Sequence, residues 1–405
     1  MPTVAPGHVR LVLFRSRSDE EFYLEIPVSI IHLNCLKPIK YLRFLGWCII
    51  GLLGDVCTVR RQEDDTNAAS DADEAPTDDA SDAQTNDVDI HYDKVADDEG
   101  LVECTIYVYV YKPQQPGDSQ LRYAIYPQIF KRPSNASSSS GASTQRRNLD
   151  FRTEIIERDR MCPFTYQKPH VCQATHIIDF RLADAAMNII VADRMSTGHV
   201  QADPQDMLIG DSIDDAHNGI LLMTTLHTTQ ESSKLWAIVK TPNLVLKKSD
   251  IPPSPTLRAV VDDDTHLYPR DARYTLQLLE DATNFRRLLG TDKGLDAAFE
   301  RNLHAASRPS AMLMHYMYGV NAVHHWGHGT ECLAPEMPAM ERKKRLRPKR
   351  PIEYTPGAAE MIVLGFWANT PEAIERRRRE KEERKDRIER WCEDLGTQAY
   401  TEDGT

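Results

Sequence analysis

The stretch NGILLMTTLHTTQE, residues 218–231, places an Asn-Gly pair, a short apolar run, a histidine and a carboxylate in that order. Asn-Gly is a turn signal, and a short apolar run after a turn is typical of a buried strand. The residues that follow the run favour a helix, so His227 and Glu231 are four positions apart on one helical face. The stretch therefore predicts a strand that passes directly into a helix with a histidine near its start.

A second histidine, His176, lies upstream in CQATHIIDF, residues 172–180, at the end of a run that reads as a short strand. Hydrolysis of a phosphodiester needs a base for the attacking water and a cation for the charge that builds on the phosphate. A neutral imidazole, with an ordinary pKa of about 6.5, suits the role of base near neutral pH. We therefore predict that His176 is the base and that His227 binds a metal ion.

These residues resemble the His-Asn-His (HNH) endonucleases, whose ββα-metal fold packs a hairpin against one helix around a divalent ion. The start RDRMC, residues 158–162, and the NGILL run are similar to HNH domains of many fungal proteins of unassigned role. The resemblance covers roughly residues 148–245 and implies an α+β nuclease module. It makes His176 the base, Asn218 the residue whose amide fixes the loop carrying the base, and His227 the metal ligand. The implied metal is Mg²⁺ or Mn²⁺, with Zn²⁺ as an alternative.

One position departs from the resemblance. Many family members carry an acidic residue or a histidine just before the first histidine as a second metal ligand, but this chain has Thr175 there, a poor ligand for a hard cation. We expect Glu231 to be the second ligand, with Asp179 as an alternative. The 41 residues between His176 and Asn218 are also a long insertion for this motif. A nucleic-acid-binding or regulatory protein that keeps the scaffold without catalysis is therefore the alternative to a nuclease.

The composition fits a folded protein with two or three domains, because 405 residues exceed one ordinary core and 41% of them are hydrophobic. The net charge is -12, but residues 63–99 hold 15 acidic residues against one lysine, so nucleic acid is not excluded as a partner. The longest apolar stretch, residues 44–54, is shorter than the ~20 residues that span a bilayer. Eight irregularly spaced cysteines fit reduced thiols better than disulfides or a zinc ribbon. We expect an intracellular protein that does not bind membranes.

Shifts in composition predict the domain order. We expect an N-terminal mostly-β domain over residues 1–62 and 100–132, an acidic disordered insertion at 63–99, a flexible linker at 133–147, an HNH nuclease-like domain at 148–250, a helical region at 251–330, a basic loop at 331–370 and a charged helix at 371–396. The expected fold is therefore α+β, with the nuclease module in the middle.

The basic loop contains RKKRLRPKR, residues 342–350, with seven basic residues in nine. Such a run suits nuclear import or contact with nucleic-acid phosphates, here through Arg342, Lys343, Lys344 and Arg345. We predict a nuclear location on this basis, and a cytoplasmic one otherwise. The expected partner is nucleic acid, DNA rather than RNA. The apolar stripe near the end of the charged helix and the N-terminal domain are candidate surfaces for a protein partner.

Overall fold

The computed structural model describes residues 3–15, 21–60, 91–111, 125, 143–196, 206, 209–254, 266–281, 294–301 and 303–330. All of them lie in the first of two compact units, residues 1–336. The basic loop and the charged C-terminal helix lie outside the described residues, so the predictions made for them remain predictions. Among the described helices, none is long and apolar enough to cross a membrane.

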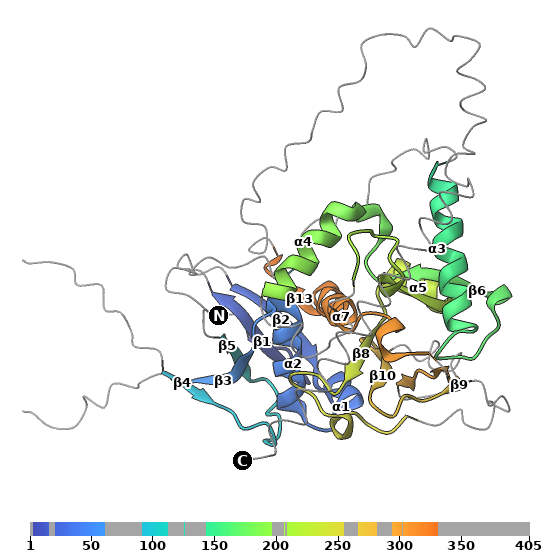
Figure 1. The fold of residues 1–405 in the computed structure, drawn as a ribbon. Helices are drawn as coiled ribbons and strands as arrows, with labels where there is room; N and C mark the ends of the chain where they lie inside the picture. Colours follow the sequence, from blue (N-terminus) through green and yellow to red (C-terminus); the bar gives the residue numbers. More distant parts are fainter. Residues whose placement is uncertain are drawn as a thin grey trace, which may run out of the picture. The chain divides into compact units, whose positions relative to one another are not determined.

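A six-stranded mixed sheet forms the N-terminal part (Figure 1). Its strands, in the spatial order β13-β2-β1-β5-β3-β4, are β1 (His8–Arg15), β2 (Glu21–Pro27), β3 (Gly54–Arg60), β4 (His91–Lys94), β5 (Ile106–Tyr111) and β13 (Gly327–His328). Buried and partly exposed residues alternate along β2, so one face of this strand packs on the core. β1 pairs antiparallel with β2 and parallel with β5. Because β13 pairs with β2, the end of the described chain completes the N-terminal sheet.

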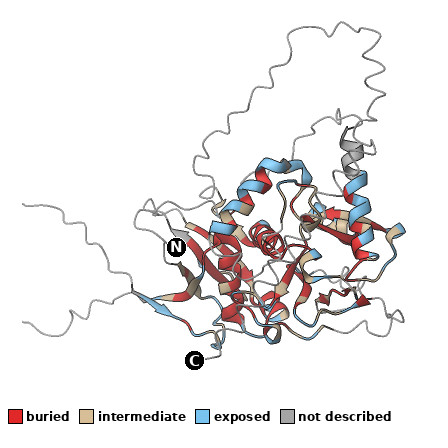
Figure 2. Ribbon diagram, in the orientation of Figure 1, coloured by how far each residue is buried: buried red, intermediate tan, exposed pale blue. Residues whose placement is uncertain are grey.

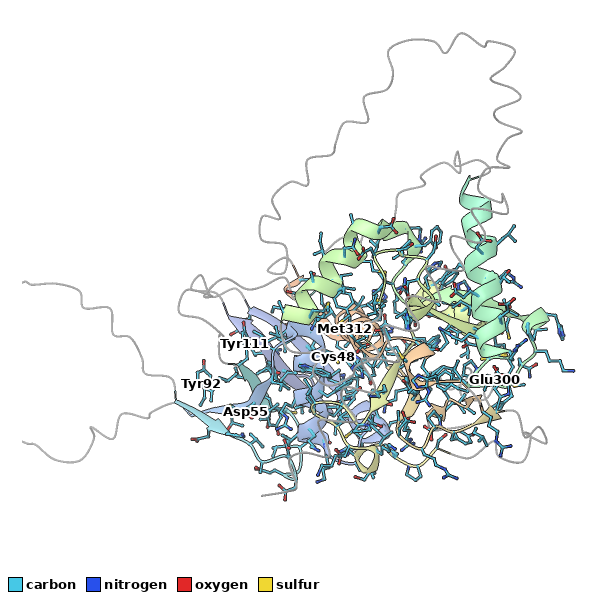
Figure 3. The ribbon with its side chains drawn as sticks, viewed as in Figure 1. Cys48, Asp55, Tyr92, Tyr111, Glu300 and Met312 are labelled. Carbon is cyan, nitrogen blue, oxygen red and sulfur yellow. The ribbon has the colours of Figure 1, made fainter. Side chains whose placement is uncertain are left out.

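Three helices pack with this sheet: α1 (Val28–Asn34), α2 (Pro38–Ile50) and α7 (Ala311–Trp326). α2 has a proline in its first turn and ends at Gly51 in a left-handed conformation, the common start and stop signals of a helix. Twelve of its 13 residues are buried, and Figure 2 shows the same dense burial in α7. A Cβ on Gly319 of α7 would lie 2.7 Å from the carbonyl oxygen of Cys48, so only glycine allows the two helices to approach this closely. Cys48 and Met312 are labelled in this part of Figure 3. The N-terminal part therefore contains a mixed sheet together with the buried helices α1 and α2.

The expected hairpin and helix are present in the middle of the chain. β6 (Cys172–His176) pairs antiparallel with β7 (Gly219–Met223), and α5 (Thr224–Ser233) follows β7 without a loop. The pairing places His176 opposite Gly219, so the end of β6 lies beside Asn218. α3 (Ser143–Asp159) packs against both strands. This is the ββα arrangement expected from the sequence, with an additional helix in front of it.

The expectation of a helical region at 251–330 is wrong for the described residues 266–281 and 294–300. There the chain forms β9 (His266–Leu267), β10 (Arg273–Leu278), β11 (Leu295–Asp296) and β12 (Phe299–Glu300). β10 lies between β11 and β8 (Trp236–Thr241). Its leucines favour a helix in isolation, but pairing on both sides buries nearly the whole segment, and this burial determines the structure. Among the described residues of this region, α7 is the one long helix.

Two predicted boundaries also need correction. Residues 91–94 were expected in the disordered acidic insertion, but they form β4, because pairing with β3 supplies backbone partners that the composition does not reveal. Residues 143–147 were expected in the flexible linker, but α3 begins at Ser143 and carries the helix through them. Residues 63–90 of the predicted insertion and residues 133–142 of the predicted linker lie outside the described residues.

Candidate nuclease site

The end of α3 fixes the turn from which β7 starts. Arg158 donates to the backbone oxygens of Ala216 (2.6 Å) and Gly219 (2.7 Å), on either side of Asn218. Its guanidinium is also paired with Asp159 (Nε to Oδ1, 2.6 Å), and Asp159 Oδ2 accepts the Leu221 amide at 2.8 Å. Both side chains are buried, and they form an ion pair at the end of the helix. A charge pair hidden from water persists here because nearly every polar atom has a partner.

Gly219 is needed for contact with α3, not for a turn. Its backbone is extended (φ -127°, ψ 152°), and a short 3-10 turn, Ala216–Asn218, precedes it. A Cβ at this position would clash with Ile155 and would lie 2.7 Å from Cζ of Phe151. The Asn-Gly pair therefore differs from the turn expected from the sequence: Asn218 closes the 3-10 turn, and Gly219 lets the strand pass under the helix.

Asn218 is fully buried and uses its side chain to hold the segment that follows His176. Its Oδ1 accepts the Ile178 amide at 2.7 Å, and its Nδ2 donates to the backbone oxygens of Ile178 (3.1 Å) and Ile213 (2.8 Å). The Asn218 side chain thus joins the backbone near the start of the long insertion, at Ile178, to the backbone near its end, at Ile213. An Asp in its place would lack the two N–H donors.

His176 is held at one ring nitrogen and on one face. Its Nε2 lies 2.9 Å from Asp214 Oδ1, and its ring stacks on Phe151 with a centroid separation of 3.9 Å. Because an ionised carboxylate only accepts hydrogen bonds, the neutral ring carries its hydrogen on Nε2 and its lone pair on Nδ1. Burial lowers the pKa of His176 below its ordinary 6.5, although Asp214 and Asp179 act in the opposite direction. The ring is therefore neutral at pH 7.

His227 and Glu231 lie on successive turns of α5, with His227 Nε2 3.6 Å from Glu231 Oε1. The side chain of His227 is 18% exposed and that of Glu231 is 53% exposed, so both can reach solvent. Two ligands of one ion at bond lengths of about 2.0–2.2 Å lie roughly 3–3.5 Å apart. The observed spacing is close to this range, and these two side chains fit a shared divalent ion.

The described residues contain no group of three or more His, Cys, Asp or Glu side chains arranged to hold a metal. Thr175 does not supply a third ligand, because its hydroxyl is buried and bonds to the Gln173 carbonyl in its own strand. Asp179 is bonded on both oxygens by the Arg181 guanidinium. An ion on His227 and Glu231 would therefore complete its coordination with water and substrate oxygens.

A small cavity of ≈ 40 Å³ opens beside the base. Thr175, His176 and Gln230 form part of its lining, together with residues of β8 and α7. A water molecule needs roughly 10–15 Å³ of such space. The cavity can therefore admit water next to His176.

The long insertion between His176 and Asn218 connects the β6–β7 hairpin to the N-terminal helices. Within it, α4 (Ala183–Ser196) carries the fully buried Arg194, which donates to the backbone oxygens of Trp47 (3.3 Å) and Ile49 (3.1 Å) at the end of α2. Asp206 accepts from the Met312 amide at 3.1 Å in the first turn of α7. The insertion is therefore part of the framework that holds the site.

Sequence reasoning did not identify Phe151 and Asp214 as neighbours of His176. Phe151 follows a helical apolar spacing, which indicates only that it faces a core. Asp214 lies 38 residues from His176, in a polar loop whose sequence gives no sign of which side chain turns inward. Only the folded insertion brings Asp214 to His176.

Comparison with known families gives a match to the family described as HNH endonuclease over residues 162–231. These residues contain β6, β7 and α5, so the chain carries an HNH endonuclease domain at the hairpin and helix just described. No curated protein and no solved structure matches the chain. The similarity to fungal proteins therefore remains a prediction.

Proposed function

We propose that the protein is a metal-dependent endonuclease that hydrolyses phosphodiester bonds in nucleic acid, in DNA rather than RNA. The observation that carries the proposal is the placement of three side chains by one hairpin and one helix. His176 ends β6, Asn218 immediately precedes β7, and His227 lies in the second turn of α5. The HNH domain match over the same residues supports the same activity.

His176 acts as the general base in this proposal. Its Nδ1 takes a proton from the attacking water. The imidazolium that forms still donates its Nε2 hydrogen to the Asp214 carboxylate. Phe151 restricts the ring to one plane. Asn218 acts indirectly, because it holds the backbone at Ile178, two residues beyond the base. The base is thus positioned before substrate arrives.

His227 and Glu231 are the residues that would hold the divalent ion, Mg²⁺ or Mn²⁺ with Zn²⁺ as the alternative. The bound ion supplies a positive charge for the oxygens of the scissile phosphate. Their partial exposure leaves the face of α5 open to a phosphate and to water.

The proposal is tested by incubating the purified full-length protein with supercoiled plasmid and Mg²⁺ or Mn²⁺. The wild-type protein should nick the plasmid, and His176→Ala should lower the rate about 10²- to 10⁴-fold, since the general base is lost. His170→Ala is the matched control, because His170 is exposed at the start of the same hairpin and has no proposed role. Equal nicking by the two variants would remove His176 as the base.

The alternative is an HNH scaffold that binds nucleic acid or regulates another protein without cutting. The buried hydroxyl of Thr175 and the pairing of Asp179 with Arg181 favour it, because both remove potential metal ligands. Calorimetry with Mn²⁺ separates the two functions. A binding site that disappears in His227→Ala supports the nuclease, whereas the absence of such a site together with uncut plasmid supports the scaffold.

We further propose nuclear import through residues 342–350, which lie outside the described residues. The support is their density of basic residues alone. Deletion of these nine residues from a fluorescently tagged chain should reduce the nuclear fraction, and an unchanged fraction would reject import by this segment.

A further inference from the structure

Four charged side chains lie together beside the proposed site: Asp179, Arg181, Glu231 and Lys234. Two come from the segment after His176, and two come from the end of α5. The charges of Asp179, Glu231 and Arg181 all act on Lys234, and the charge of Asp179 also acts on His176. Asp179 thus acts on the proposed base and Glu231 is a proposed metal ligand, but the proposed mechanism assigns nothing to the two cations.

Arg181 uses only part of its guanidinium within the protein. Its Nε and Nη2 bond to the carboxylate of Asp179, and its backbone amide bonds to Asp179 Oδ1 at 2.9 Å. Among the described residues, none accepts a hydrogen bond from Nη1, and 45% of the side chain is exposed. A guanidinium held on one edge and open on the other can bind a second anion in a fixed orientation.

The backbone of Lys234 is held in place by a hydrogen bond, but its ammonium group is not. It ends α5 in a left-handed conformation (φ 55°, ψ 25°), and its carbonyl accepts from His325 Nε2 at 3.1 Å. In the described part of the chain, no side chain forms a hydrogen bond or ion pair with its ammonium group. Burial lowers the pKa of Lys234, although Asp179 and Glu231 partly offset this effect. A partly desolvated ammonium without a partner is stabilised when an anion binds next to it.

We propose that Arg181 and Lys234 together bind one backbone phosphodiester of the nucleic acid, and that Asp179 competes with this phosphate for Arg181. The proposal rests on the proposed function, because it places the phosphate beside the base. It names two contacts that sequence reasoning did not, since the basic residues singled out there were Arg342 to Arg345. Lys234 also lies beyond the matched residues 162–231.

The test is the binding of a short, mixed-sequence, fluorescently labelled DNA duplex to the full-length protein in EDTA, so that no cleavage occurs. Anisotropy titrations run from about 50 to 200 mM salt. Arg181→Gln and Lys234→Gln should each weaken binding about ten-fold, because each removes one charge-assisted hydrogen bond to phosphate. Each should also reduce the slope of log K against log salt by about 1.

Two further variants make the test specific. Asp179→Asn should tighten binding, because it removes the carboxylate that competes for Arg181. Lys168→Gln is the matched control, since Lys168 is an exposed lysine on the same domain outside the cluster, and its affinity and slope should equal those of the wild type. The four substituted side chains, at positions 168, 179, 181 and 234, are at least partly exposed. Melting temperatures equal to that of the wild type are the control for intact folding.

Unchanged affinity and slope in both Arg181→Gln and Lys234→Gln would overturn the proposal, and so would a wild-type protein that binds no DNA at low salt. Inorganic phosphate that binds alone and is lost in the same two variants, with DNA binding unaffected, would reassign the pair to a small anion and overturn it as well. Failure of the proposed function looks different. Loss of slope in the two variants without any cutting in Mg²⁺ supports this phosphate site and rejects the nuclease.

Discussion

α2 and α5 show how differently the two halves of the molecule are built. In α2, twelve of 13 residues are buried, and the helix lies against the sheet and α7. In α5, Leu226 is the only buried residue of ten. The helix is held instead by single contacts, such as the Trp236 indole that donates to the Leu226 carbonyl at 3.2 Å. α2 is part of a core, whereas α5 is a surface on which side chains are displayed.

The difference shows where each half obtains its stability. The hairpin, α3, α5 and β8 share an apolar cluster that includes Phe151, Leu221, Leu226 and Trp236. Buried polar groups with satisfied bonds add to this packing at the start of β7, as Arg158, Asp159 and Asn218 do. The insertion then connects this polar framework to the apolar core through Arg194. The chemistry can vary on α5 because the framework lies elsewhere.

The largest effect is expected for Arg158→Met. This change leaves Asp159 buried without its cation and frees the backbone oxygens of Ala216 and Gly219. Breaking a buried pair on one side costs about 3–5 kcal/mol. Urea unfolding should show this loss, whereas Arg152→Met, an exposed arginine of the same helix, should stay within about 0.5 kcal/mol. Equal stability of the two variants would contradict a polar framework in this half.

A smaller effect is expected for Asp214→Asn, which alters the partner of the proposed base. In the proposed mechanism the neutral form of His176 is the active one, so the cleavage rate should be constant above pH 6.5 and fall as the pH drops through its lowered pKa. The Asp214 carboxylate raises that pKa. Its removal should therefore shift the acid limb to lower pH and reduce the maximal rate about ten-fold or more.

Rates measured across this pH range with constant metal concentration provide the check. Asp211→Asn is the matched control, because Asp211 is exposed in the same loop, and its profile should match the wild type. An acid limb that stays in place in Asp214→Asn, or that moves to higher pH, would show that Asp214 does not act on His176.

The smallest effect on stability is expected at His227 of α5. His227→Ala should lower the free energy of unfolding by about 1 kcal/mol or less, since the side chain is 18% exposed and is not part of the apolar cluster that contains Leu226. Leu226→Ala, one residue earlier, should cost about 2–5 kcal/mol. Denaturant titration of both variants gives the comparison. A large loss in His227→Ala would mean that α5 is part of the core after all.

The chain order of the site could be read from the sequence, but its contacts could not. A strand ending at His176 and a helix starting before His227 follow from local patterns of period two and 3.6. The strand β10 was missed because leucine-rich segments of this length fit either structure until a neighbouring strand pairs with them. β4 was missed for the same reason within an acidic segment.

The sequence by itself determined the elements whose signals are local, the β6–β7 hairpin and α5. It also determined that one imidazole lies at the end of β6 and another near the start of α5. The tertiary structure alone decided that Phe151 and Asp214 contact His176, and that the insertion joins α2 and α7. Those contacts join residues far apart in the chain. They depend on the tertiary fold of the whole backbone, which neither local periodicity nor the preferences of single residues can predict.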